Sequence, residues 1–273
     1  MKKENIPTVR LDYWSTFGQR LVDLMELNTG AKVLDVGTGS AACLIPAAKK
    51  IGSLGQIIGI DKYEKVIPIA NENIQKAGLI NASAQLMDAE EMKFKNHSFD
   101  YILSGFIGFS NVYDFKNHNY RKENKKMTEI FRVLKEGGKV GFSTWELQED
   151  IETIRELVRK YLEHHSGNLE KTENIPPGYS KETTEGFKKL MLDAGFQNIQ
   201  IATEKFSIVY RDEVEWWETM SQVASWVLKQ TIGLEPEILQ DFKEKMLKKE
   251  LQSYKRESGY YFTKSVIFAL GMK

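Results

Sequence analysis

Two hydrophobic periods alternate along the chain. Apolar residues at spacings of three and four predict helices at 11–27, 40–50, 64–77 and 120–134. Short apolar runs between them predict buried strands at 32–36, 56–60, 83–87, 99–104 and 139–144. Because strands and helices alternate through short connections, we expect a mostly parallel sheet with helices on both faces.

The helix predicted for 40–50 contains a proline. Ser40 is a suitable N-cap for this helix, and Pro46 lies inside it. Proline has no backbone N–H and its ring clashes with the preceding turn. Pro46 therefore predicts either a bend or a late start of the helix, and the sequence leaves both possibilities open.

The alternation is interrupted twice. It stops after Trp145, returns with a helix at 183–194 and a strand at 199–205, and stops again at 209. The chain ends on a strand. We therefore expect one doubly wound α/β domain with seven strands and two helical insertions. Its core covers about 11–145, 183–205 and 260–270, and the insertions cover about 146–182 and 209–259.

Charge and cysteine content narrow the classes of function. The 273 residues carry 38 basic and 38 acidic side chains, whereas nucleic-acid binders usually show a basic excess, so we expect no nucleic-acid partner. Cys43 is the single cysteine, which excludes an intramolecular disulfide and a cysteine-based metal site. The first residues lack the apolar core of a secretory signal, and no apolar run approaches the roughly 20 residues of a membrane span. We therefore expect a cytoplasmic protein without a membrane span.

A glycine loop follows the first predicted strand. The stretch VLDVGTGSA, residues 33–41, places Gly37 and Gly39 between that strand and the next helix. Glycines there can adopt positive φ and bring no Cβ near a ligand, and a helix N-terminus favours an anionic group. With Ala42 the spacing fits the dinucleotide fingerprint G-x-G-x-x-G/A, and Asp61 lies where a carboxylate binds ribose hydroxyls. This pattern fits both NAD and S-adenosylmethionine.

Three further positions favour S-adenosylmethionine over NAD. Asp35 stands two residues before Gly37, where a carboxylate suits an ammonium group and would repel a pyrophosphate. Asp88 follows the third strand, where it can accept a hydrogen bond from an adenine amino group. The fourth strand ends at Ser104–Gly105, whose free carbonyls can receive the methionine ammonium. These strand ends share the carboxyl edge of the predicted sheet, where open α/β folds bind ligands.

Together these segments resemble the class I S-adenosylmethionine-dependent methyltransferases. VLDVGTGSA resembles the family's first motif, IIGID its second, LMDAEEM its third and FDYILSGF its fourth. EIFRVLKEGGKVGFSTW resembles the fifth strand with its preceding helix, and LMLDAGFQNIQI resembles the passage to the sixth strand. The branch that it resembles is the ubiquinone/menaquinone-biosynthesis type. The resemblance implies a single methyltransferase domain over 1–273, a Rossmann-like sheet with an antiparallel last strand, and S-adenosyl-L-methionine as the cofactor.

The resemblance also implies a set of cofactor-binding residues in these motifs and in the first helix. Lys62 stands where the family often has an apolar residue against adenine, and its aliphatic stem can take that place. The loop departs from the family at Ala41, where a third glycine is common. We expect the cofactor site to comprise Tyr13, Asp35, Gly37, Thr38, Gly39, Ser40, Asp61, Lys62, Asp88, Ala89, Ser104 and Phe106.

Aromatic residues in the second insertion and the first helix bear on the acceptor. Trp216, Met220, Val223 and Val227 share one helical face, which either packs on the core or walls a substrate pocket as a lid. The resembling family selects its substrates through such insertions and the N-terminal helix. We therefore expect a small-molecule acceptor that is apolar or aromatic.

Methyl transfer needs few groups from the protein. It is an in-line displacement, to which a protein contributes mainly positioning and the exclusion of water. A base is needed only where the acceptor loses a proton. His118, which follows the fourth strand and its loop, is the candidate base, and a solvated surface histidine is the alternative. No ligand spacing calls for a metal.

The leading hypothesis is methyl transfer from S-adenosylmethionine to a small molecule. An NAD-dependent oxidoreductase fits the glycine spacing, but Asp35 argues against it. A non-catalytic module that keeps the fold and the cofactor is the third hypothesis, because a fold does not imply a function. The patterns name neither the methylated atom (O, N or C) nor an oligomeric state.

Overall fold

The structure is a computed structural model that describes residues 6–10, 13–165, 182–231, 235–247 and 250–273. Part of the first predicted insertion, at 166–181, lies outside these residues. The strands are β1 Thr8–Val9, β2 Lys32–Val36, β3 Gln56–Asp61, β4 Ala82–Leu86, β5 Phe99–Gly105, β6 Tyr113–Asp114, β7 Asn119–Tyr120, β8 Leu134–Gln148, β9 Gln197–Tyr210, β10 Lys255–Arg256 and β11 Gly259–Met272. The helices are α1 Tyr13–Met25, α2 Leu44–Ile51, α3 Val66–Lys76, α4 Lys125–Val133, α5 Glu149–His165, α7 Thr184–Asp193, α8 Glu213–Val223, α9 Ser225–Thr231 and α10 Pro236–Phe242, with a π-helical turn η1 Lys243–Leu247 and a 3₁₀ turn η2 Leu251–Tyr254.

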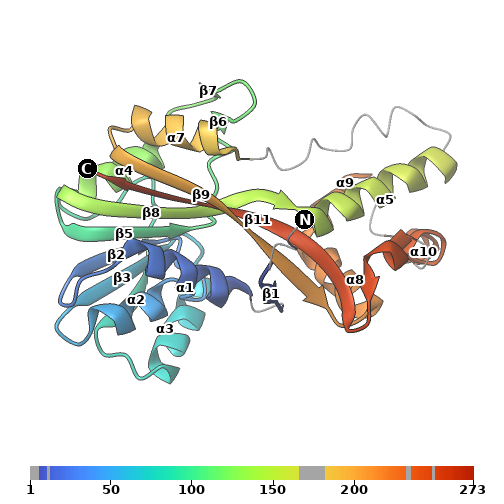
Figure 1. The fold of residues 1–273 in the computed structure, drawn as a ribbon, viewed down its shortest axis with the longest axis horizontal. Helices are drawn as coiled ribbons and strands as arrows, with labels where there is room; N and C mark the ends of the chain where they lie inside the picture. The colour runs from blue at the N-terminus through green and yellow to red at the C-terminus, as the bar shows by residue number, and fades with distance from the viewer. Residues whose placement is uncertain (1–5, 11–12, 166–181, 232–234, 248–249) are drawn as a thin grey trace. The chain divides into compact units, whose positions relative to one another are not determined.

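In the described part of the chain, nine strands form one mixed sheet (Figure 1). Their order is β1-β9-β11-β8-β5-β2-β3-β4, and β10 pairs with β11. β2 runs parallel to β3 and β5, β3 runs parallel to β4, and β5 runs parallel to β8. The sheet is mostly parallel with antiparallel C-terminal strands, which confirms the predicted fold class.

Seven strands of this sheet correspond to the seven predicted ones, and β1 and β10 were not predicted. Both are two residues long, too short to show a hydrophobic period. β8 also begins earlier than expected, at Leu134. The sequence did not predict this start, because the first six residues of the strand, LKEGGK, are mostly polar and contain no apolar run.

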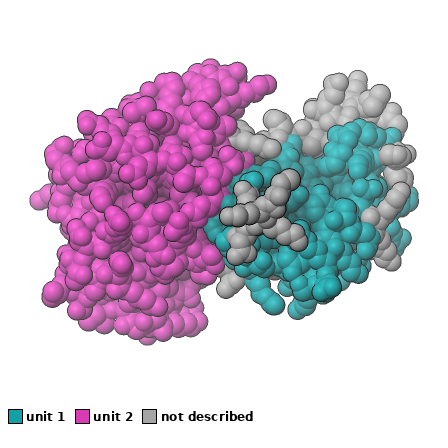
Figure 2. Space-filling model, in the orientation of Figure 1, with its two compact units in different colours: residues 1–11, 147–179, 205–265 teal, residues 12–146, 180–204, 266–273 magenta. Residues whose placement is uncertain are grey.

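The chain divides into two compact units (Figure 2). Unit 2 comprises 12–146, 180–204 and 266–273, which are nearly the segments expected for the core. Unit 1 comprises 1–11, 147–179 and 205–265, which include most of the two expected insertions. The parallel strand pairs β3–β4, β2–β3 and β2–β5 belong to unit 2. The predicted cofactor motifs therefore belong to unit 2 as well.

Unit 1 buries the aromatic face that the sequence marked in its second insertion. Trp216 and Met220 are fully buried, and the Trp216 ring stacks on Phe262 at 5.8 Å between centroids. Val223, which the helical period places on the same face, is 44% exposed. Trp216 and Met220 therefore pack into the interior of unit 1, and the lid over a substrate stays a prediction.

Helix α2 starts late. It begins at Leu44 with Cys43 as its N-cap and without a side-chain cap, so the predicted Ser40 cap is wrong. Pro46 thereby falls in the first helical turn, where backbone N–H groups have no partner within the helix. Because Pro46 lies in the first turn, its missing backbone N–H removes no hydrogen bond within the helix. A helix that starts late therefore accommodates the proline without a bend.

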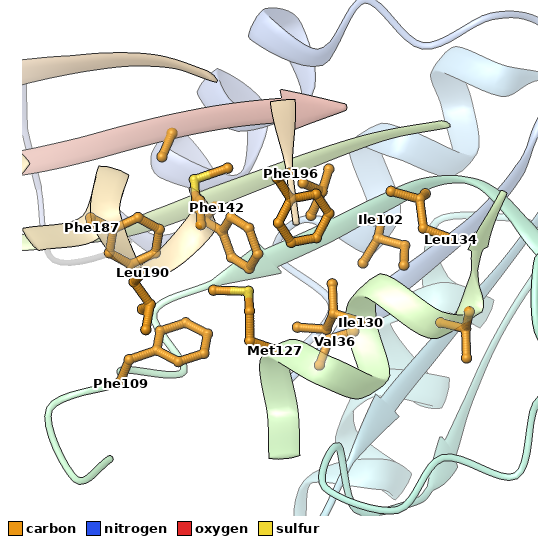
Figure 3. Packing of buried hydrophobic residues seen from close by; sticks show 14 of the residues in the cluster. Val36, Ile102, Phe109, Met127, Ile130, Leu134, Phe142, Phe187, Leu190 and Phe196 are labelled. Carbon is orange, nitrogen blue, oxygen red and sulfur yellow. The ribbon is translucent and has the colours of Figure 1, made fainter. Parts of the chain in front are cut away.

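A hydrophobic cluster in unit 2 packs α4 and α7 against β5 and β8 (Figure 3). Met127 comes from α4 and Phe187 from α7. The ring of Phe187 lies 5.5 Å from that of Phe142 on β8 and 5.7 Å from that of Phe109. Because the cluster includes Phe109, it anchors one end of the segment that follows β5.

Candidate cofactor site

The carboxyl ends of β2, β3, β4 and β5 meet at one edge of unit 2, because these strands run parallel. A cavity of about 370 Å³, here called the edge cavity, lies at this edge. Small-molecule sites commonly measure ~300–1,000 Å³. Six of the predicted cofactor residues line the edge cavity: Gly37, Asp61, Lys62, Asp88, Ala89 and Phe106.

The other predicted cofactor residues lie next to the edge cavity or away from it. Asp35, Thr38 and Ser104 are buried. The Ser104 hydroxyl donates to the Val36 carbonyl at 3.2 Å and so links β5 to β2. Ser40 lines a separate cavity of about 440 Å³ beside α1 and α2. Gly39 and Tyr13 do not line the edge cavity. The contacts of these residues with a cofactor stay predictions.

The glycine loop has the conformation that its glycines predict. Gly37 has φ +74° and Gly39 has φ +51°. The backbone N–H groups of Gly37 and Thr38 both donate to the Ile60 carbonyl, at 2.8 and 3.0 Å, which ties the loop to β3. A Cβ added at Gly37 would lie 2.1 Å from Cγ2 of Ile107. Glycine is therefore required at position 37 both for its φ and for the close approach of Ile107.

Ala41 shares the left-handed conformation of the loop glycines, with φ +75°. A residue with a Cβ pays about 1–2 kcal/mol for this conformation. A glycine, which the family commonly has at this position, would adopt this φ without strain. Ala41 adopts the same φ with backbone strain.

Asp61 joins the end of β3 to the glycine loop. Its Oδ2 accepts from the Gly39 N–H at 3.1 Å, and its Oδ1 accepts from the Tyr63 N–H at 3.0 Å. The carboxylate is thus oriented by two backbone donors at the wall of the edge cavity, which suits a role in binding hydroxyl groups.

Asp35 is buried beneath the loop with 1% of its surface exposed. The Thr38 hydroxyl donates to its Oδ2 at 2.7 Å. Burial raises the pKa of Asp35 to about 7, although the hydrogen bond from Thr38 acts in the opposite direction. The described contacts of Asp35 therefore hold the loop, and its proposed contact with an ammonium group stays a prediction.

Comparison with known proteins identifies the family. A model of the family described as "Methyltransferase domain" matches residues 27–195, which include the glycine loop, Asp61, Asp88 and the end of β5. The chain belongs to the class I S-adenosylmethionine-dependent methyltransferases. This methyltransferase family binds S-adenosyl-L-methionine, which supports the predicted cofactor over NAD.

The curated relatives of this chain match it over part of their length. Aklanonic acid methyltransferase DauC of Streptomyces sp. (strain C5) is 42% identical over 96 residues, which are 35% of this chain and 44% of that protein. Demethylmenaquinone methyltransferase of Bacillus cytotoxicus is 33% identical over 117 residues, 43% of this chain and 46% of that protein. The chain thus spans just under half the length of these relatives.

Solved structures confirm the fold of the chain. The YcgJ protein of Bacillus subtilis superposes with a TM-score of 0.57 at 16% identity, covering 94% of this chain and 98% of that one. The [4+2]-cyclase SpnF superposes with a TM-score of 0.52 at 18% identity, covering 93% and 81%. A cyclase among the similar folds shows that the fold by itself does not set the reaction.

The structure places the candidate base, His118, on the surface. It lies between β6 and β7, which pair as a short antiparallel hairpin, and its side chain is exposed. It does not line the edge cavity. The described part of the chain also holds no cluster of three or more metal-ligating side chains, and none of its helices is long and apolar enough to cross a bilayer.

Five aromatic rings of unit 2 gather beside the edge cavity. Phe106, which lines the cavity, lies 4.4 Å from the ring of Trp145 and 5.1 Å from that of Trp14. Tyr13 and Phe17 complete the group. Trp14 is 43% exposed, whereas Tyr13 is buried. We call these five residues the aromatic cluster.

Two charged residues near the edge cavity were missed by the sequence reasoning. Lys126 on α4 lines the cavity, and burial lowers its pKa. Glu182 precedes α7, is 4% exposed, and has a pKa raised by burial. Neither lies in a recognisable motif, and the chain has many exposed lysines and glutamates. The sequence therefore offers no signal that separates these two from solvated surface charges.

Proposed function

We propose that this chain transfers the methyl group of S-adenosylmethionine to a small-molecule acceptor by in-line displacement. The observation that carries the proposal is the edge cavity, where Asp61 and Asp88 stand with Gly37 at the ends of neighbouring parallel strands. Carboxylates at these places suit ribose hydroxyls and an adenine amino group. Membership of the family supports the same reading.

The residues around the cavity fit this cofactor. Gly37 has no Cβ and so lets Ile107 come close to the loop at the cavity wall, and Asp61 is already oriented by two backbone donors. When bound, S-adenosylmethionine supplies an electrophilic methyl group on a positively charged sulfonium. The protein's own part is to bind the nucleoside with Asp61 and Asp88, to bring the glycine loop close, and to exclude water with the side chains of Phe106 and Ile107.

We propose that the acceptor is apolar or aromatic. The aromatic cluster supports this, because Phe106 belongs both to it and to the cavity wall, and its neighbour Trp14 is 43% exposed. Exposed aromatic faces attract flat apolar ligands through burial of apolar area and through ring stacking. The names of the curated relatives, aklanonic acid and demethylmenaquinone methyltransferase, are those of enzymes acting on small molecules.

Titration calorimetry with S-adenosylmethionine tests the cofactor. We expect binding by the intact chain and at least roughly 10-fold weaker binding by Asp61→Ala, because a hydrogen bond to a charged group contributes about 1.5–3 kcal/mol. Asp23→Ala is the matched control, since Asp23 is exposed on α1 outside the edge cavity. Failure of the intact chain to bind, while it remains folded by circular dichroism, would overturn the proposal.

Transfer is then measured with methyl-labelled S-adenosylmethionine and a panel of phenols, quinols and polar amines. Label recovered in an organic extract supports an apolar or aromatic acceptor. Label transferred only to the polar amines contradicts that acceptor class. Cofactor binding without transfer to any acceptor supports the non-catalytic module instead.

A further inference from the structure

A turn beside the edge cavity is held by two residues of opposite charge. Glu182 Oε1 accepts from the Phe109 N–H at 2.7 Å. On the other side of the turn, Lys126 Nζ donates to the Gly108 carbonyl at 2.7 Å. The peptide group between Gly108 and Phe109 is thus held at its N–H by a carboxylate and at its carbonyl by an ammonium group.

The Glu182 carboxylate is fully engaged although it is buried. Its Oε2 accepts from the Thr144 hydroxyl at 2.5 Å, so both oxygens have donors. A buried carboxylate is costly unless hydrogen bonds replace its water. Here the replacing donors come from the turn and from Thr144 within β8. The hydrogen bonds that stabilise the buried Glu182 carboxylate therefore also stabilise the turn.

The residues just before this turn form a wall of the edge cavity. Gly105, Phe106 and Ile107 line it, and Ile107 packs against Gly37 of the glycine loop. Phe106 has φ +57°, a conformation that a bulky side chain rarely adopts. Such strain persists only where the surroundings determine the backbone. Phe106 is held before the turn by its N–H, which donates to the Ser143 carbonyl at 2.8 Å.

We propose that Glu182 is a positioning residue that, with Lys126, holds the Gly108–Ser110 turn and thereby sets the cofactor-binding shape of the edge cavity. Glu182 does not itself line the cavity, so it acts through the backbone of the turn. The proposal rests on the proposed function, since it takes S-adenosylmethionine as the ligand of the cavity. It assigns to Glu182 an effect on cofactor affinity that no motif of the chain predicts.

The experiment is titration calorimetry of the full chain with S-adenosylhomocysteine, comparing Glu182→Gln with the intact protein. Glutamine keeps the shape of the side chain but loses the charge and one acceptor. We expect the Kd to rise about 10-fold with the binding stoichiometry unchanged. A purely structural defect would instead lower the stoichiometry, because part of the protein would be unfolded, and leave the Kd of the folded fraction as it was. Glu185→Gln is the matched control, since Glu185 is exposed three residues further on.

Hydrogen exchange of the Phe109 amide, measured without ligand, gives an independent readout. We expect faster exchange in Glu182→Gln than in the intact chain and in Glu185→Gln. Unchanged Kd or unchanged exchange in Glu182→Gln overturns the proposal. If that variant does not fold, Thr144→Val takes its place, because it removes only the hydroxyl that donates to Oε2; an unchanged Kd there also overturns it.

The binding measurements distinguish a wrong cofactor assignment from a wrong role of Glu182. If the intact chain does not bind S-adenosylhomocysteine at all, the cofactor assignment fails and the proposal that rests on it fails with it. If the intact chain binds and Glu182→Gln binds equally well, the cofactor stands and only the role of Glu182 is rejected.

Discussion

Asp35 is a buried acid at the base of the glycine loop, and its burial has a consequence for stability. Its pKa is raised to about 7 by burial, above the value of about 3.9 for an exposed aspartate. The folded state therefore binds a proton that the unfolded state releases near pH 4. The free energy of unfolding contributed by this residue falls as the pH rises from about 4 to about 7 and is level above that range.

We expect Asp35→Asn to remove this loss, because an amide does not ionise. The difference in unfolding free energy, variant minus intact chain, should be about 2.6 kcal/mol larger at pH 8 than at pH 5. Urea denaturation of both proteins at the two pH values measures it. An equal difference at both values would show that Asp35 titrates in the folded chain as an exposed aspartate does.

Ala41 is the second residue of the loop whose backbone carries a testable cost. Its φ of +75° suits glycine, yet its methyl group is fully buried. In Ala41→Gly the relief of strain, about 1–2 kcal/mol, is offset by the lost methyl burial and by the greater freedom of the unfolded chain. We expect a change in unfolding free energy within about 1 kcal/mol and an unchanged cofactor Kd.

Ala41→Val is the contrasting substitution. A β-branched residue is a genuine outlier at positive φ, so we expect a loss of about 2 kcal/mol or more. Thermal or urea unfolding of the two variants decides the matter. A valine tolerated as well as the glycine would mean that the loop changes its backbone conformation at this position.

At the scale of elements, helix α2 shows how one proline sets a boundary. Pro46 is the third residue of the helix, where its missing N–H removes no helical hydrogen bond. Asn81 holds the later part of α2, because its side-chain amide donates to the Ala48 carbonyl at 3.0 Å.

We expect Pro46→Ala to change the unfolding free energy by less than about 1 kcal/mol, and Ala48→Pro to lower it by about 3 kcal/mol or more. The second proline would fall where its N–H belongs to the helix. Urea denaturation of the pair measures the contrast. Comparable losses for both variants would place the start of α2 elsewhere.

The strands show which parts of a sheet a hydrophobic pattern can mark. β2, with the sequence KVLDV, is buried at four of its five positions, and its apolar run predicted it with both ends correct. β9 runs from Gln197 to Tyr210, beyond the predicted 199–205, because its exposed and buried residues do not follow one apolar run. A parallel strand covered on both faces leaves a clear pattern, whereas a partly exposed strand does not.

At the scale of the whole molecule, the predicted cofactor motifs and most of the predicted insertions belong to different compact units. Unit 2 contains the ordered motifs of the cofactor site, and its segments nearly match the predicted core. Unit 1 contains most of the predicted insertions, whose interior is built around Trp216, Phe262 and a buried ion pair between Lys264 and Asp150 at 2.8 Å. Aromatic residues on one face of a helix can be buried by packing inside such a unit. Their pattern in the sequence therefore does not by itself indicate a substrate pocket.

The sequence by itself determined the fold class, the family resemblance and the residues at the strand ends, since hydrophobic periods and glycine chemistry act over short spans of chain. It placed Gly37, Asp61 and Asp88 correctly at one edge of the sheet. Only the tertiary structure decided that Asp35 is buried under the loop and that Glu182 reaches the turn after β5. Burial and long-range hydrogen bonding depend on which distant segments meet, and a local pattern does not contain that information.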